Sequence, residues 1–210
     1  GIEEIPVLAR EGAIVPLKNM EVFDNNTDNP KSLEIKIFPG KTGSFTLRED
    51  EGDSVEESWV ETKLEKAQEE GKDCFIIHSP QGNTEVLPEK RCWKLDFVKI
   101  KENTVSVLVD GKETAYKATV EKNGMCIEIT EVPVNAEIKV VFENPIEESL
   151  ADLAQEAYAI LEKAQISYNL KSDLYELIKE QQKGAIATLA SMELEPEMFG
   201  ALCEILTAEK

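Results

Sequence analysis

The densest group of chemically active side chains in this sequence is the acidic run Glu49-Asp50-Glu51-Gly52-Asp53. Clustered carboxylates are the ligands that a hard cation such as Ca²⁺ prefers in proteins. The run lacks the alternating ligands and the later glutamate that a calcium loop of the EF-hand type requires. We therefore favour a solvated turn over a metal site, and we predict no metal ligands in this chain.

Aromatic side chains offer a second kind of chemistry, because exposed rings can stack on the faces of sugar rings. The candidates are Trp59, Trp93, Phe97 and Tyr116. Each lies in a pattern of alternating polarity that is typical of a β-strand, where large aromatic residues most often fill a core. We favour core packing for all four, with sugar stacking by Trp59 and Trp93 as the alternative.

The remaining reactive side chains are one histidine and four cysteines. His78 follows an apolar stretch and has no matching nucleophile, so we predict a structural or surface role for it. The cysteines include no Cys-x-x-Cys pair, and three of them lie in apolar strand patterns, which favours reduced, buried thiols and a cytoplasmic protein. They are Cys74, Cys92, Cys126 and Cys203.

The composition excludes several classes of partner. The chain has 42 acidic and 23 basic residues and a net charge of -19, which repels nucleic-acid phosphates and anionic lipid surfaces. Hydrophobic residues make up 41% and charged residues 31% of the chain, as in ordinary soluble globular proteins. No apolar run approaches the roughly 20 residues that span a bilayer. We predict no nucleic-acid partner and no membrane partner.

Extended segments dominate the first 144 residues. In the first 54 we expect a hairpin with strands at 5–9 and 14–15 around a turn at 10–12, then strands at 20–23, 33–38 and 43–48. Pro6 and Pro16 lack the N–H of a central ladder and belong at strand ends or on an edge. Seven further strands are expected at 59–65, 74–78, 92–100, 104–109, 115–120, 126–129 and 138–142. Asp110-Gly111 and Asn123-Gly124 suit tight hairpin turns.

The hydrophobic period changes near Asn144-Pro145. Asn144 can cap a helix and Pro145 fits its first position, so we expect a helix to begin there. Apolar residues then recur every three or four positions, which predicts three or four short helices. Lys183-Gly184 and Glu195-Pro196 are expected to separate the later helices, through a C-terminal glycine and an N-terminal proline. We favour packing of these helices on one another over a surface for a second subunit.

Two segments carry a family resemblance. The stretch Ile5-Pro-Val-Leu-Ala-Arg-Glu-Gly-Ala-Ile-Val-Pro-Leu17, and Leu47-Arg-Glu-Asp-Glu-Gly52 after it, resemble the C-terminal region of glycoside hydrolase family 31, the α-glucosidase and α-xylosidase family. There an Ile-Pro-Val-Phe strand, an Arg-Ala-Gly turn and an Ile-Ile-Pro return precede a Leu-Tyr-Glu-Asp-Asp-Gly motif. This chain departs from that pattern at Leu8, Glu11, Val15, Arg48 and Glu51. The close match covers about a quarter of the chain, and no match is seen beyond Pro145.

The strand and helix patterns together predict a mainly β fold with an α tail: antiparallel β-sandwich domains followed by a small C-terminal helical bundle at 145–210. The resemblance implies that 1–54 is the end of a proximal sandwich and 55–144 a distal sandwich. A retaining glycosidase needs two carboxyl groups about 5 Å apart. The family supplies both from its catalytic barrel, and its Trp-x-Asp-Met-Asn-Glu strand is absent here.

We therefore expect a non-catalytic accessory or scaffold region of a retaining α-glycosidase, without catalytic residues and without a cofactor. Its expected partners are the catalytic barrel of the same polypeptide and, through the parent enzyme, an α-glycoside. The competing hypothesis is a self-standing carbohydrate-binding or protein-interaction module. Because the chain begins at Gly1, we interpret it as an excised fragment. We expect an uncovered apolar face near Ile5, Val7, Ile14 and Leu17, so the chain either self-associates into a homo-oligomer through its first 50 or so residues or folds that segment tightly against the distal sandwich.

Overall fold

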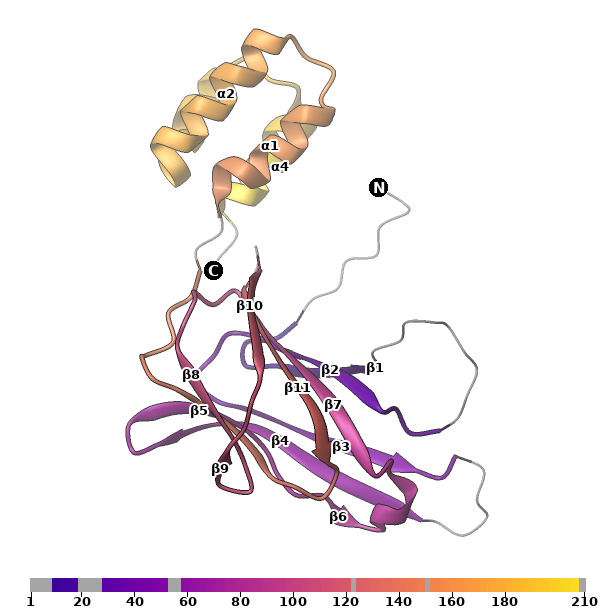
Figure 1. The fold of residues 1–210 in the computed structure, drawn as a ribbon. Coiled ribbons are helices and arrows are strands. Elements are labelled where there is room, and N and C mark those ends of the chain that lie inside the picture. The colour runs from indigo at the N-terminus through magenta and orange to yellow at the C-terminus, as the bar shows by residue number, and fades with distance from the viewer. Residues whose placement is uncertain (1–8, 19–27, 53–57, 122–123, 150–151, 208–210) are drawn as a thin grey trace. The chain divides into compact units, whose positions relative to one another are not determined.

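The structure is a computed structural model that describes residues 9–18, 28–52, 58–121, 124–149 and 152–207. The chain divides into two compact units, Gly1–Ser149 and Leu150–Lys210. The first unit is built of β-strands and the second of α-helices (Figure 1). The predicted class, mainly β with an α tail, is therefore confirmed.

The first sheet has the strand order β1-β2-β7-β11-β10 among the described residues. Its strands are β1 (Ile14–Lys18), β2 (Ser32–Ile37), β7 (Lys90–Val98), β11 (Gly124–Pro133) and β10 (Lys117–Glu121). β2 and β7 run parallel, with Ser32 opposite Cys92 and Ile37 opposite Phe97, whereas the other pairs are antiparallel. Pro16 lies in β1, an edge strand, as its missing N–H predicts.

The second sheet has the order β3-β4-β5-β12-β8-β9, with a short strand β6 also paired to β4. Its antiparallel strands are β3 (Gly43–Asp50), β4 (Trp59–Glu69), β5 (Lys72–Ile77), β6 (Gln81–Gly82), β8 (Val105–Val109), β9 (Lys112–Glu113) and β12 (Ile138–Phe142). A 3₁₀ turn (Thr84–Val86) follows β6. At the β8–β9 hairpin, Asp110 and Gly111 have φ of 50° and 75°, as a two-residue loop requires.

One hydrophobic core joins the two sheets. Leu33, Ile35 and Ile37 share the inward face of β2, as their alternation predicts, and all are at most 4% exposed. They belong to one cluster with buried residues of the second sheet, such as Phe75 and Val140. Glu34 and Lys36 alternate with the buried β2 residues on the other face of the strand, so the sequence period of two sets which side chains face the core.

The strands of residues 1–54 and 55–144 are interleaved rather than separate. β2 pairs with β7 in the first sheet, and β3 pairs with β4 in the second. The expected boundary at residue 54 thus falls within a β-hairpin, and the structure groups both expected sandwiches into one unit. The sequence of a short strand with alternating polarity does not indicate which other strand it pairs with. The expected separation into two sandwiches therefore differs from the structure. The expected strands at 5–9 and 20–23 lie outside the described residues, except for Ala9.

No helix begins at Asn144-Pro145, and that prediction was wrong. The Asn103 side chain donates to the Asn144 carbonyl at 3.0 Å, and the Lys101 amide donates to the Glu147 carbonyl at 2.9 Å. Residues 144–149 therefore follow the edge of the sandwich. The first helix starts eight residues later, because Asp152 provides the cap: its carboxylate accepts the Gln155 amide at 3.1 Å.

The helical unit contains α1 (Leu153–Lys163), α2 (Tyr168–Gln181), α3 (Ala185–Ser191) and α4 (Pro196–Thr207). Pro196 occupies the first position of α4, as predicted. Gly184 does not end α2: its φ is -64°, and a 3₁₀ turn at Gln182–Gly184, opened by Gln182 at φ 51°, connects to α3. The apolar stripes meet in one core that contains Leu161, Leu174 and Leu189, so the helices do pack on one another.

Candidate functional site

The acidic run that stood out in the sequence is partly a buried structural element. Glu49 lies near the end of β3, on the inward face, and is 7% exposed. Its carboxylate oxygens accept hydrogen bonds from Nη1 and Nη2 of Arg91 at 2.9 and 2.8 Å. The prediction of a solvated turn is therefore wrong for Glu49, although Asp50, Glu51 and Gly52 are exposed as expected. Asp53 lies outside the described residues.

Arg91 is the centre of this arrangement. It is 1% exposed on the inward face of β7, where the neighbouring inward position is Trp93. Its Nε donates to the Pro30 carbonyl at 2.9 Å, and its guanidinium lies 5.5 Å from the centre of the Trp93 ring. The three contacts fix the end of β3 and the residues before β2 to the first sheet. A bidentate pair of this kind is strong because two charge-assisted hydrogen bonds form in one fixed geometry.

The two tryptophans occupy different environments. Trp93 and Phe97 are 4% and 3% exposed and belong to the sandwich core, which confirms core packing for both. Trp59 and Tyr116 are 37% and 38% exposed, so the same prediction was wrong for them. The Arg48 guanidinium lies 4.6 Å from the centre of the Trp59 ring. The structure contains no coplanar exposed pair of these tryptophans, since Trp93 is inside.

His78 directly follows β5 and lies close to two carboxylates. Its Nε2 lies 2.6 Å from a Glu65 carboxylate oxygen, and its Nδ1 lies 3.6 Å from Glu137. Its backbone amide donates to the Lys63 carbonyl. These contacts agree with the predicted structural role.

All four cysteines are free thiols, as predicted. Cys74 and Cys126 are buried, whereas Cys92 and Cys203 are partly exposed. Burial raises the pKa of Cys126 to about 11 and also raises the pKa of Cys74. The buried thiols therefore behave as small apolar side chains at neutral pH.

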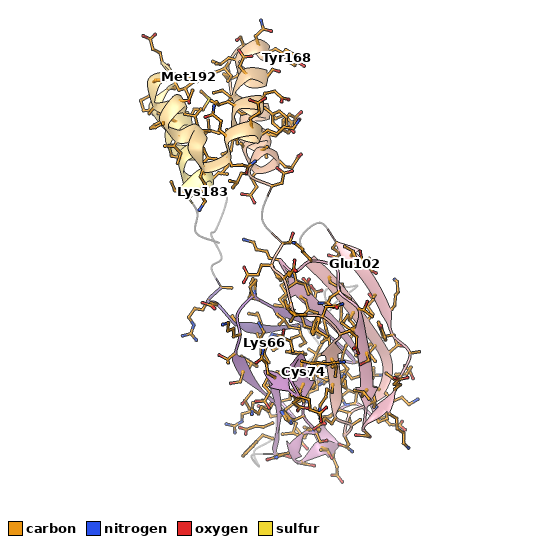
Figure 2. All side chains as sticks on the ribbon, turned by 90° about the vertical axis from the view of Figure 1, so that its left-hand side faces the viewer. Lys66, Cys74, Glu102, Tyr168, Lys183 and Met192 are labelled. Atoms are coloured by element: carbon orange, nitrogen blue, oxygen red, sulfur yellow. The ribbon has the colours of Figure 1, made fainter. Side chains whose placement is uncertain are left out.

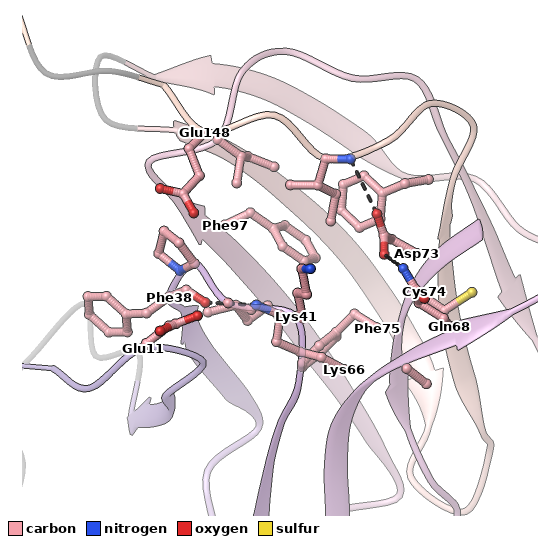
Figure 3. A pocket seen from close by; sticks show the side chains of 17 residues that line it. Glu11, Phe38, Lys41, Lys66, Gln68, Asp73, Cys74, Phe75, Phe97 and Glu148 are labelled. Carbon is pink, nitrogen blue, oxygen red and sulfur yellow. Dashed lines mark hydrogen bonds between the residues drawn. The ribbon is translucent and has the colours of Figure 1, made fainter. Parts of the chain in front are cut away.

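A pocket of about 300 Å³ opens among strands of the sandwich unit (Figure 3). The end of β2 and the following turn supply Phe38, Pro39 and Lys41. The β4–β5 hairpin supplies Lys66 from β4 and Asp73 and Cys74 from β5. Lys66 and Cys74 are labelled in Figure 2. The pocket forms here because the β2–β3 turn and the segment after β12 both pass the open end of the core.

The polar groups of the pocket carry both signs of charge. Lys66 donates from Nζ to the Phe38 carbonyl at 2.9 Å. Burial lowers the pKa of Lys66 below its usual value, and the nearby carboxylates of Asp73, Glu148 and Glu11 oppose that shift. Asp73 accepts the Gln68 amide at 2.9 Å and the Ile146 backbone amide at 3.3 Å. Lys66 is thus a cation held in place among carboxylates.

Within the described ranges, no group of three or more His, Cys, Asp or Glu side chains is arranged to hold a metal ion. None of the described helices is both long and apolar enough to cross a membrane.

Comparison with known proteins finds similarity at the level of solved structures. No protein-family model matches the chain, and no curated protein matches it. Two solved structures of a glycoside hydrolase family 31 dextranase from Flavobacterium johnsoniae, a mutant with isomaltotriose and an enzyme complexed with glucose, are similar to it. Each overlaps with a TM-score of 0.47 at 18% identity and covers 63% of this chain. The chain spans 19% of each dextranase chain. The dextranase belongs to the family that the two sequence motifs resemble.

Sequence reasoning missed the partner of Glu49 and the pocket around Lys66. The burial of Arg91 could have been predicted from the sequence, because Arg91 shares one face of its strand with Trp93, Leu95 and Phe97. A charged residue at an inward strand position requires an opposite charge nearby. The pocket had no such signal, since its walls come from segments that are distant in the sequence.

Proposed function

We propose that this chain is a non-catalytic accessory and scaffold region of a retaining α-glycosidase of the α-glucosidase or α-xylosidase type, an enzyme that hydrolyses O-glycosidic bonds. The proposal rests on the sequence motifs, which resemble family 31. Its catalytic partner is the barrel of the same polypeptide, and the α-glycoside is bound and cleaved there. The four free thiols support a cytoplasmic location.

The main observation in support of a non-catalytic role is the Glu49–Arg91 pair. Glu49 belongs to the motif that resembles family 31, in the run richest in carboxylates. A general acid or nucleophile must reach the substrate. Both Glu49 oxygens instead bind Arg91 in a site that is 1% to 7% exposed. The motif therefore supports the sheet, and its most buried acid is unavailable for chemistry.

The alternative hypothesis, that the chain binds carbohydrate through Trp59 and Trp93, has less support. A stacking platform needs ring faces open to solvent, and Trp93 is 4% exposed. Trp59 has the Arg48 guanidinium against its ring. Stacking at Trp59 stays a prediction that a Trp59→Ala variant can test.

The test compares two purified proteins. The first is this chain, and the second is the product of the complete reading frame that contains it. Aryl α-glucosides and aryl α-xylosides are supplied to both. We expect no turnover by the chain above a buffer control, and hydrolysis of at least one substrate by the full product. Turnover by the chain alone, or an inactive full product, contradicts the proposal.

A further inference from the structure

The pocket near Lys66 has an aromatic floor. Phe97 packs edge to face against Phe75 and Phe142, with ring centres 5.8 and 5.1 Å apart. All three line the pocket and belong to strands of both sheets. The floor is therefore rigid, because each ring is fixed by its neighbours in a close-packed core.

The rim of the pocket is polar, and some of its hydrogen-bond donors and acceptors have no partner among the described residues. Lys66 uses one of its ammonium protons on the Phe38 carbonyl, and its other two remain available. Glu11 and Glu148 point into the region of the pocket (Figure 3). In the part of the chain that the structure describes, no hydrogen bond or ion pair joins either carboxylate to another residue. The rim thus offers a donor and strong acceptors above an apolar floor.

The mixture of charges decides the class of ligand. A phosphate or sulfate would approach Lys66 but would meet the carboxylates of Glu11, Asp73 and Glu148. A cation would meet the ammonium groups of Lys41 and Lys66, which both line the pocket. A wholly apolar group would leave the Lys66 donors and the acceptors of the rim desolvated without partners. A neutral ring with hydroxyl groups at its edge and C–H groups on its face satisfies both parts of the pocket.

We propose that this pocket is a binding site for one neutral, hydroxyl-rich ring of monosaccharide size. The volume of about 300 Å³ is at the small end of ligand pockets and suits a single ring. Glu148 and Glu11 accept hydroxyl protons of the ligand, and Lys66 donates to a hydroxyl oxygen. The C–H face of the ring lies toward Phe97. The site is separate from the tryptophans, neither of which lines the pocket.

This inference goes beyond the proposed function, because a scaffold needs no ligand. The absence of turnover by the chain and the binding of a ligand in this pocket are independent predictions, so either can be wrong while the other is right. The assay for the pocket is therefore a binding assay and involves no turnover.

The experiment is a titration of the ¹⁵N-labelled chain with D-glucose and with D-xylose up to about 100 mM, followed by amide chemical shifts. We expect saturable shifts confined to residues around the pocket, including those near Lys66, Asp73 and Glu148. Inorganic phosphate at the same concentration should not produce them. Chemical-shift mapping locates the ligand in the unmodified protein, so the result does not depend on any variant folding.

Two variants and a matched control sharpen the test. Lys66→Met keeps the apolar stem and removes the donor, and we expect it to weaken binding by about tenfold. Glu148→Gln, at an exposed position, should weaken it severalfold. Lys139→Met is the control, since Lys139 lies on β12, pairs with Glu69 at 2.8 Å and does not line the pocket. It should bind as the unmodified chain does.

Three results would overturn the proposal. The first is the absence of saturable shifts with either sugar. The second is a set of shifts centred on Trp59 that disappears in Trp59→Ala and persists in Lys66→Met. The third is binding of inorganic phosphate in the pocket without binding of the sugars, which would mean that the Lys66 charge dominates the rim.

Discussion

Glu49→Ala is the most informative single change in the sandwich. It removes the only hydrogen-bonding partners of the Arg91 Nη atoms among the described residues and leaves a guanidinium that is 1% exposed. Breaking a buried ion pair in this way costs about 3 to 5 kcal/mol, since the remaining charge stays desolvated. We expect a loss of that size in the free energy of unfolding of the sandwich unit, a large part of the stability of an ordinary domain.

The chain provides its own probe for this measurement. Its two tryptophans, Trp59 and Trp93, both lie in the sandwich unit, and Trp93 is next to Arg91. Tryptophan fluorescence during urea unfolding therefore reports on the sandwich and excludes the helical unit. The control is Glu51→Ala, an exposed acid in the same run, which should change the stability by less than about 0.5 kcal/mol.

A double variant separates charge burial from packing. Glu49→Leu combined with Arg91→Met replaces the pair by apolar side chains, and it should recover most of the stability lost in Glu49→Ala. A free energy of unfolding for Glu49→Ala within about 0.5 kcal/mol of that for Glu51→Ala would refute this prediction. It would mean that the Glu49–Arg91 pair does not stabilise the sandwich unit.

Four further predictions follow from single elements. Iodoacetamide at about pH 8 should alkylate Cys126 far more slowly in the native chain than in urea. The reason is that a pKa of about 11 in place of 9.0 lowers the thiolate fraction about a hundredfold. Equal alkylation rates, measured by mass spectrometry, would contradict this. NMR titration of ¹³C-methylated lysines should give Lys66 a pKa below its usual value, and Glu148→Gln should lower it further, since it removes a carboxylate that favours the ammonium; an unchanged or higher value would refute the assignment. Asp152→Ala should destabilise the helical unit by about 1 kcal/mol in a thermal melt followed by circular dichroism, whereas mid-helix Asp173→Ala should not, because only Asp152 caps α1. If the chain self-associates through its first 50 or so residues, Leu17→Lys on the edge strand β1, where Leu17 is 41% exposed, should reduce the mass measured by light scattering; an unchanged dimer would place the contact elsewhere.

Local patterns in the sequence predict most strands of this fold. The alternation of Leu33, Ile35 and Ile37 identifies an inward face, and Asp110-Gly111 identifies a hairpin, because both depend on neighbouring residues only. Strand pairing is not local: nothing in β2 specifies that it lies parallel to β7. The expected division at residue 54 depended on that pairing.

The same distinction applies to the site. Glu49 was visible as an acid, but its environment depends on Arg91, which lies 42 positions away in the sequence. The helix start was misplaced because Asn144 has the right residue type for a cap, while its neighbourhood is held by Asn103. Asp152 has the same residue preference, and its carboxylate caps α1. Residue type suggests a role, and tertiary contacts decide between the candidates.

We propose that this region stabilises a glycosidase without taking part in its chemistry. Glu49→Ala introduced into the full reading-frame product tests it directly, with activity on an aryl α-glycoside measured well below the melting temperature and after heating. We expect kcat/KM within about twofold of the unmodified enzyme below the melting temperature, together with inactivation at a lower temperature. A folded variant whose kcat falls a hundredfold with its thermal inactivation unchanged would contradict it.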